Sequence, residues 1–163
     1  MIDVTFPPED ELGVEEDFGS LVYAVPEGYA PYASSETYDG RAVRFYDLPA
    51  AVHREPGVRQ LDVIVYEEPC PGAAAWLTAQ RDRLTASAGT TVGAVERVAA
   101  SPVGAYQLSW QDDRLSRLIA FEPSAAGLCG VIKVGVSGDH LSWDSLTHLG
   151  VALTLMEGTM SYR

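Results

Sequence analysis

Residues 103–121 read VGAYQLSWQDDRLSRLIAF, and this stretch decides the fold class. Apolar and polar residues alternate on both sides of Asp112 and Asp113, and alternation with a period of two predicts half-buried strands. Two consecutive aspartates between the runs indicate a tight turn. The stretch therefore predicts an antiparallel hairpin of strands 103–110 and 114–121. One face of the first strand carries Gly104, Tyr106, Leu108 and Trp110, and the other carries Val103, Ala105, Gln107 and Ser109.

Reading outward from the hairpin predicts seven strands and two helices. The strands are expected at 20–25, 41–47, 59–66, 91–99, 103–110, 114–121 and 128–136, and the helices at 72–88 and about 142–158. This order has no regular alternation of strand and helix, which argues against a doubly wound parallel sheet. We predict a single α+β domain over residues 20–163, an antiparallel sheet of about six or seven strands flanked by two helices (β-β-β-α-β-β-β-β-α).

The N-terminal segment carries a large part of the negative charge. The chain has 163 residues, with 23 acidic and 11 basic side chains and a formal net charge of −12. Seven of the acids lie within residues 1–17, where there is no base, which leaves 16 acids against 11 bases, or −5. Together with Pro7 and Pro8, this composition predicts a flexible acidic arm over residues 1–19. Such an arm either solubilises the protein or docks on a basic partner or on the domain's own site.

The overall composition narrows the class of protein. Hydrophobic residues make up 47% and charged residues 21%, as in ordinary globular domains. A negative surface repels nucleic-acid phosphates and anionic lipids, so we expect neither nucleic acid nor a membrane as the partner. No run is long and apolar enough for a membrane helix, and no signal-peptide pattern is seen. Two cysteines without a disulfide-rich pattern indicate a reducing compartment, and we expect a cytoplasmic protein.

Familiar catalytic motifs are not found along the chain. There is no glycine-rich phosphate loop, no Gly-x-Ser-x-Gly elbow and no His-Glu-x-x-His pair. We therefore expect no cofactor and no metal ion, and we expect binding rather than catalysis.

If the protein is an enzyme, the candidate catalytic residues are His148, Asp144 and Cys70. His140, Asp144 and His148 are spaced by four residues, and within one helix they would share a face on which they could ligate a metal ion or act as acid, base and orienting group. Cys70 precedes a predicted helix start, where the helix dipole lowers a thiol pKa. Structural roles explain the same residues. Asp144 would place a favourable charge at a helix start, His148 would lie at a solvated edge, and Cys70 would be a buried thiol.

Four polar residues on the predicted strands form a candidate binding face. They are Arg44, Gln107, Arg117 and Lys133. If they share one face of the sheet, that face is locally basic on an acidic protein. It could then recognise a carboxylate or an acidic segment, including the protein's own arm. Solvated outer positions are the simpler interpretation.

The closing helix and a tyrosine-rich loop are two further candidate contact surfaces. The helix carries one apolar stripe, made of Leu146, Leu149, Leu153, Met156 and Met160. Val151 and Leu155 lie on its other side, so the helix needs cover on both sides, from the arm, a loop, a partner or a second copy of the chain. The loop carries Tyr29, Tyr32 and Tyr38, and tyrosine is typical of protein contact surfaces.

The order of these elements resembles a known family. The order begins with a strand that runs into the turn Val25–Gly28, and the strand–helix unit 61–88 follows. Next come the segment GAYQLSW at 104–110 and its hairpin partner 114–121. A long apolar strand and a closing helix complete the order. In this order the chain resembles the PsbP/Mog-like α/β/α sandwich. That group includes small effector-associated chaperones of type VI secretion and actinobacterial lipoproteins of similar build.

The resemblance implies a domain that binds another polypeptide without catalysis, and in the chaperone branch a dimer that shelters apolar helices. We therefore expect a non-catalytic protein-binding domain, an adaptor or chaperone of a secreted or partner polypeptide, acting as a homodimer. One alternative is a small cofactor-free enzyme of the cyclase or isomerase type. Another is an acidic immunity or inhibitor protein that would bind through Glu9–Asp17.

Overall fold

The hairpin at 103–121 lies within a large antiparallel sheet. Our computed structural model describes residues 13–26, 36–38, 41–46, 61–99, 101–112, 114–137 and 152–163. Strand β8 (Ala105–Gln111) pairs antiparallel with β9 (Arg114–Phe121), so that Ala105 lies opposite Phe121 and Gln111 opposite Leu115. The predicted hairpin is confirmed.

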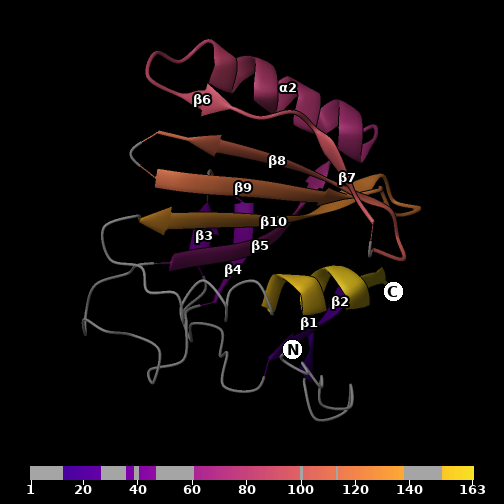
Figure 1. Cartoon of the computed structure of the whole chain (residues 1–163). Helices are drawn as coiled ribbons and strands as arrows, with labels where there is room; N and C mark the ends of the chain where they lie inside the picture. The colour runs from indigo at the N-terminus through magenta and orange to yellow at the C-terminus, as the bar shows by residue number, and fades with distance from the viewer. Residues whose placement is uncertain are drawn as a thin grey trace, which may run out of the picture.

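The main sheet has eight strands in the order β3-β4-β5-β10-β9-β8-β6, with β7 also paired to β8 (Figure 1). The remaining strands are β3 (Glu36–Tyr38), β4 (Arg41–Tyr46), β5 (Leu61–Pro69), β6 (Thr91–Val92), β7 (Glu96–Val98) and β10 (Leu128–Ser137). All of these pairs are antiparallel, which confirms the α+β class. The run predicted as one strand at 91–99 is broken at Gly93, whose N–H donates to Ser109 O at 2.9 Å.

A second, smaller sheet consists of β1 (Gly13–Phe18), β2 (Leu21–Pro26) and β11 (Ser161–Tyr162) in the order β1-β2-β11. β1 pairs with β2 along its whole length, so the prediction of a flexible arm is wrong for residues 13–18. The acidic composition hid a strand pattern in which Glu15 and Asp17 are exposed while Glu16 and Phe18 are half-buried. Residues 1–12 of the predicted arm lie outside the described residues.

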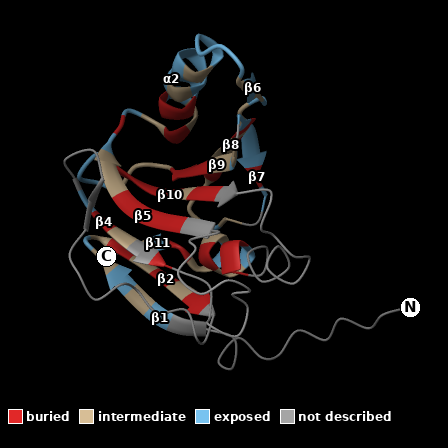
Figure 2. Cartoon of the chain, turned by 90° about the vertical axis from the view of Figure 1, so that its left-hand side faces the viewer, coloured by how far each residue is buried: buried red, intermediate tan, exposed pale blue. Residues whose placement is uncertain are grey.

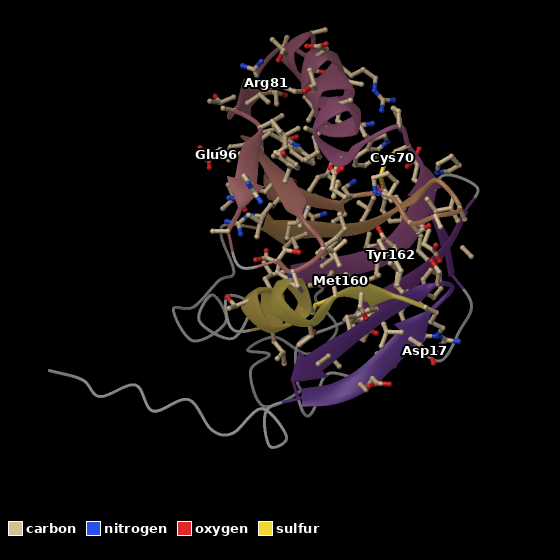
Figure 3. The ribbon with its side chains drawn as sticks, turned by 90° about the vertical axis from the view of Figure 1, so that its right-hand side faces the viewer. Asp17, Cys70, Arg81, Glu96, Met160 and Tyr162 are labelled. Atoms are coloured by element: carbon tan, nitrogen blue, oxygen red, sulfur yellow. A yellow bond between two sulfur atoms is a disulfide. The ribbon has the colours of Figure 1, made fainter. Side chains whose placement is uncertain are left out.

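The end of the chain closes this small sheet. β11 pairs with β2, and the Arg163 N–H donates to Ser20 O at 2.8 Å. The Arg163 side chain forms an ion pair with Asp17 of β1. The first and last described strands are therefore held on either side of β2 (Figure 3).

The layers lie on the two faces of the main sheet (Figures 1 and 2). Helix α2 (Ala73–Thr85) covers one face and packs on a core that includes Leu77 and Leu108. The small sheet and the helical residues 152–159 cover the other face, on a second core that includes Tyr23 and Met156. The helix expected at 72–88 and the described end of the closing helix are thus both present.

The described residues of the closing helix's apolar stripe pack inward, and Leu146 and Leu149 lie outside the described residues. Leu153, Met156 and Met160 are buried against the main sheet's second core. Leu155, on the other side of the helix, is half-buried, and Val151 lies outside the described residues.

A carboxylate clamps the small sheet to the main sheet. In the β1–β2 turn, the Ser20 N–H donates to Glu67 Oε1 at 2.8 Å, and the Ser20 hydroxyl donates to Glu67 Oε2 at 2.6 Å. The neighbouring Gly19 has φ +59°, and a Cβ at that position would lie 1.8 Å from Glu67 Oε1. Only glycine therefore allows the turn to approach the β5 carboxylate so closely.

We predict that Glu67→Ala destabilises the protein by about 1–3 kcal/mol, because both Ser20 donors lose a charged acceptor. Glu67→Gln keeps one acceptor oxygen and should lose less. The measurement is urea unfolding, with Glu96→Ala, an exposed glutamate on β7, as the matched control. Hydrogen exchange should quicken in β1 and β2; unchanged exchange there would contradict the clamp.

Glu157 lies on the closing helix near a basic side chain of the sheet. Burial raises the pKa of Glu157, and the positive charge of Arg117 on β9 only partly opposes this. A carboxyl group whose pKa is raised by folding stabilises the fold when it is protonated. That contribution is lost as the pH rises through the pKa of the folded state.

We predict that Glu157→Gln raises the melting temperature at about pH 7, where the wild-type carboxylate is charged and partly buried. The gain should shrink below the ordinary glutamate pKa of 4.5, because the wild-type group is then neutral. Thermal unfolding across this pH range tests it, and Glu96→Gln serves as the exposed control. A gain that is the same at both ends of the range would contradict the assignment.

Candidate functional site

A pocket of about 370 Å³ opens between α2 and the main sheet. It is lined by Tyr66, Glu68, Trp76, Gln80, Arg83, Leu84, Ser87, Trp110, Leu118 and Lys133. Its volume lies in the range of small-ligand pockets. These residues come from α2, the stretch that follows it, and four neighbouring strands, so the pocket exists only in the folded chain.

The sheet supplies the floor of the pocket through positions that share one face. Lys133 on β10 lies directly opposite Leu118 on β9 and Ile64 on β5. Leu118 and Ile64 both belong to the core beneath α2, so Lys133 points to the same side. Tyr66 lies two residues after Ile64 on β5, and Trp110 lies two residues after Leu108 on β8, the partner of Leu118. Both side chains are therefore on that same face of the sheet. Register therefore assembles a floor with two aromatic side chains and a lysine.

Helix α2 supplies the wall, because Trp76, Gln80, Leu84 and Ser87 recur at spacings of three and four residues. The first turns of the helix are buried at Ala73, Trp76 and Leu77. Further along, Leu84 is half-buried and Arg83 is exposed. Figure 2 shows this change from buried to exposed along α2. The helix is therefore most deeply buried at its start, although Leu84 still packs against the same core, and the pocket is lined by Trp76 and by residues of the second half.

The charged groups of the pocket come from different elements. Arg83 donates a hydrogen bond to Gln80, so these two α2 side chains are held together at the wall. Lys133 and Glu68 come from the floor strands. With two bases and one acid, the lining has a formal charge of +1 on a chain of net charge −12. Such a lining can hold an apolar or aromatic group together with a carboxylate.

A disulfide joins Cys70, just before α2, to Cys129 on β10 (Figure 3). The Cα atoms are 5.8 Å apart, and the Cys70 N–H donates to Gly127 O at 3.1 Å. The sequence indicated a reducing compartment, whereas the structure joins the two distant cysteines, because pairing of β10 with β5 brings them together. Cys70 is also not available as the proposed nucleophile, because its sulfur is bonded.

The predicted basic face is only partly assembled. Arg44, Gln107 and Arg117 lie on the face of the main sheet away from α2. Their partners on the neighbouring strands are Val65, Ile119 and Val134, which belong to the core between the main sheet and the small sheet. Lys133 lies on the other face, so a shared face of all four is wrong. The register places Lys133 one residue away from Val134, the partner of Arg117, and neighbouring residues point to opposite sides.

Both arginines of that face interact with acids of the same chain. Arg44 Nη1 lies 3.3 Å from Glu16 Oε2 of β1, and its guanidinium lies 5.5 Å from the centre of the Phe18 ring. Arg117 lies close enough to Glu157 to lower its pKa. The acidic strand β1 therefore lies against one of the predicted arginines.

Several predicted site residues fall outside the described part of the chain. These are Tyr29, Tyr32, Asp144, His148 and Val151. Tyr38 lies in β3, opposite Arg41 of β4. The structure therefore brings one predicted binding residue, Lys133, into the pocket.

The groups with shifted pKa values lie on the face opposite the pocket. The hydroxyls of Tyr23 and Tyr46 are 2.6 Å apart, and burial raises the pKa of Tyr46 to about 12 and that of Tyr23 further. Burial also raises the pKa of Tyr162, whose hydroxyl accepts from the Gly130 N–H at 2.9 Å and donates to Glu122 O at 2.8 Å. Together with Glu157, these groups stand apart from the pocket lining.

The described residues hold neither a candidate metal-binding cluster nor a membrane-spanning helix. No cluster of three or more His, Cys, Asp or Glu side chains that could hold a metal ion occurs among them. No helix in the same part of the chain is long and apolar enough to cross a membrane.

From the sequence, Trp76 and Trp110 were not identified as site residues, although Trp110 was placed with Tyr106 and Leu108 on one face of its strand. Tyr66, Glu68 and Arg83 were not singled out at all. The available signal was the coincidence of a helix stripe with sheet positions of the same face, and it becomes readable only once the strand register is known.

No protein-family model and no curated protein sequence matches the chain. Solved structures are similar in fold. The Ran-binding protein Mog1p of Saccharomyces cerevisiae is 9% identical, with a TM-score of 0.57 over 92% of this chain and 95% of that one. LpqN of Mycobacterium tuberculosis, described as involved in cell envelope biogenesis, is 12% identical, with a TM-score of 0.54 over 91% and 84%.

The cyanobacterial PsbP protein of Synechocystis is 12% identical, with a TM-score of 0.52 over 88% of this chain and 87% of that one. At these identities the likeness concerns the fold alone. The chain therefore has the PsbP/Mog-like fold that its order of elements implied.

Proposed function

We propose that this chain is a non-catalytic binding domain that holds a segment of another polypeptide, with the pocket between α2 and the main sheet as its anchor site. The observation that carries the proposal is the pocket itself, an aromatic-lined space that the second half of α2 leaves open. A fold neighbour named for binding the protein Ran supports a polypeptide as the partner.

The lining indicates the chemistry of the occupant. Trp76, Trp110 and Leu118 offer apolar and aromatic surface for one large side chain of the partner. Lys133 on the floor and Arg83 at the wall favour a carboxylate beside that side chain. We therefore assign the pocket to an apolar or aromatic anchor residue with a neighbouring acidic group.

The distribution of titratable groups favours binding over acid–base catalysis. Catalytic acids and bases typically have shifted pKa values and lie in the cleft that holds the substrate. Here the shifted groups, Tyr23, Tyr46, Glu157 and Tyr162, belong to the opposite side of the main sheet. Cys70 is bonded to Cys129 rather than poised as a nucleophile. A chaperone role and a homodimer stay predictions.

The test begins with peptides selected from a displayed random library on the full chain, followed by isothermal titration calorimetry of the tightest one. We predict that the selected peptides contain an aromatic or large aliphatic residue next to an acid. Arg83→Ala should weaken their binding by about three- to tenfold, because one charge-assisted contact is lost. Ser87→Trp should abolish binding, because it places an indole at the edge of the pocket.

The matched control is Arg97→Ala, which removes an exposed arginine of β7 outside the pocket lining and should leave the affinity unchanged. Circular dichroism of each variant checks that the fold is retained. Peptides whose affinity is untouched by Ser87→Trp would bind elsewhere and would overturn the assignment of the pocket.

A further inference from the structure

We infer that the Cys70–Cys129 disulfide controls the α2 pocket, so that the oxidised chain binds its partner and the reduced chain does not. This inference rests on the proposed function, because it concerns the regulation of the same site. It also replaces the expectation of a reducing cytoplasm with that of an oxidising compartment, in which disulfides persist.

The disulfide joins the wall of the pocket to its floor. Cys70 lies between the end of β5 at Pro69 and the start of α2 at Ala73. Its partner Cys129 lies on β10, four residues before Lys133 of the pocket floor. The residue opposite Cys129 on β5 is Glu68, which itself lines the pocket. The bond therefore fixes the root of the helix to the strands that carry the floor.

Apart from the disulfide, the contacts that hold α2 among the described residues are noncovalent, beginning with the Cys70 N–H bond to Gly127 O. Gly72 at the N-cap makes no side-chain capping bond, and the Ala73 N–H donates to Glu122 Oε1 at 3.2 Å. The fully buried residues Ala73, Trp76 and Leu77 lie in the first turns, and half-buried Leu84 packs against the same core further along. Towards the other end, Arg81 Nε donates to Gly93 O at 3.0 Å in an exposed contact. The disulfide is the covalent constraint among these contacts, and we expect the width of the pocket to depend on it.

Reduction changes this constraint without adding a charge to the core. A dithiol reductant gives two electrons and two protons to the Cys70–Cys129 bond and itself becomes a disulfide, leaving two protein thiols. Cys70 is 8% exposed and Cys129 0%, and small thiols pack in such surroundings as apolar groups. We therefore expect the main sheet to persist while the root of α2 gains freedom.

Affinity follows from the fraction of molecules in which the pocket is formed. A binding-competent state that falls to about one tenth of the population weakens the apparent affinity about tenfold. The same loosening should expose the backbone amides of α2 to solvent more often, and this second readout does not depend on any ligand.

The experiment uses the full chain and a peptide selected as described above. Peptide mapping by mass spectrometry without reductant first checks the bond. Calorimetry then compares the oxidised chain, the chain in dithiothreitol, and the Cys70→Ala/Cys129→Ala double variant. Hydrogen exchange is followed in α2 and, as the internal control, in β1 and β2. Relative to the oxidised chain, we expect the chain in dithiothreitol and the double variant to bind the peptide about tenfold more weakly. In both forms hydrogen exchange should quicken in α2 and stay unchanged in β1 and β2.

Each other outcome has a definite meaning. Free thiols in the folded, air-oxidised chain would overturn the inference, and so would equal affinity and equal α2 exchange before and after reduction. If no peptide binds in any form but α2 exchange still quickens on reduction, the proposed function fails while the control of the pocket by the disulfide stands. If the double variant does not fold, dithiothreitol titration of the wild type supplies the same comparison.

Discussion

The pairing of β10 with two neighbours at once is the constraint on which the rest of the structure depends. Along its length β10 pairs with β5 on one side and with β9 on the other. Its alternate residues supply both cores: Val131 packs beneath α2, whereas Ile132 packs towards the small sheet. The register of this one strand therefore determines which side chains meet on each face, including the disulfide and the pocket floor.

The two faces of the main sheet are covered in different ways. On one face, the small sheet and the closing helix are fixed by polar contacts, such as those of Glu67 with Ser20 and of Tyr162 with Gly130. On the other face, α2 is anchored by its first turns and by a covalent bond at its root. The side with the pocket therefore combines a covalent link at the root of α2 with a largely exposed second half of the helix.

Local patterns predicted the elements well, and long-range geometry limited the rest. The β8–β9 hairpin, the start of α2 and the stripe of the closing helix could be read because alternation and helical spacing are local. β1 was missed because its many acids concealed the half-buried positions Glu16 and Phe18. The face of Lys133 and the Cys70–Cys129 bond depend on how β10 aligns with its neighbours, and single-strand patterns do not contain that alignment.

The small sheet has a practical consequence for handling the molecule. Its outer strands β1 and β11 flank β2 on the side of the main sheet away from α2. A linker joined after Arg163 would therefore extend from the side of the main sheet opposite the pocket, beside the Asp17 ion pair. A protein attached to a sensor surface or to a carrier through this end would present its pocket outward to ligands in solution.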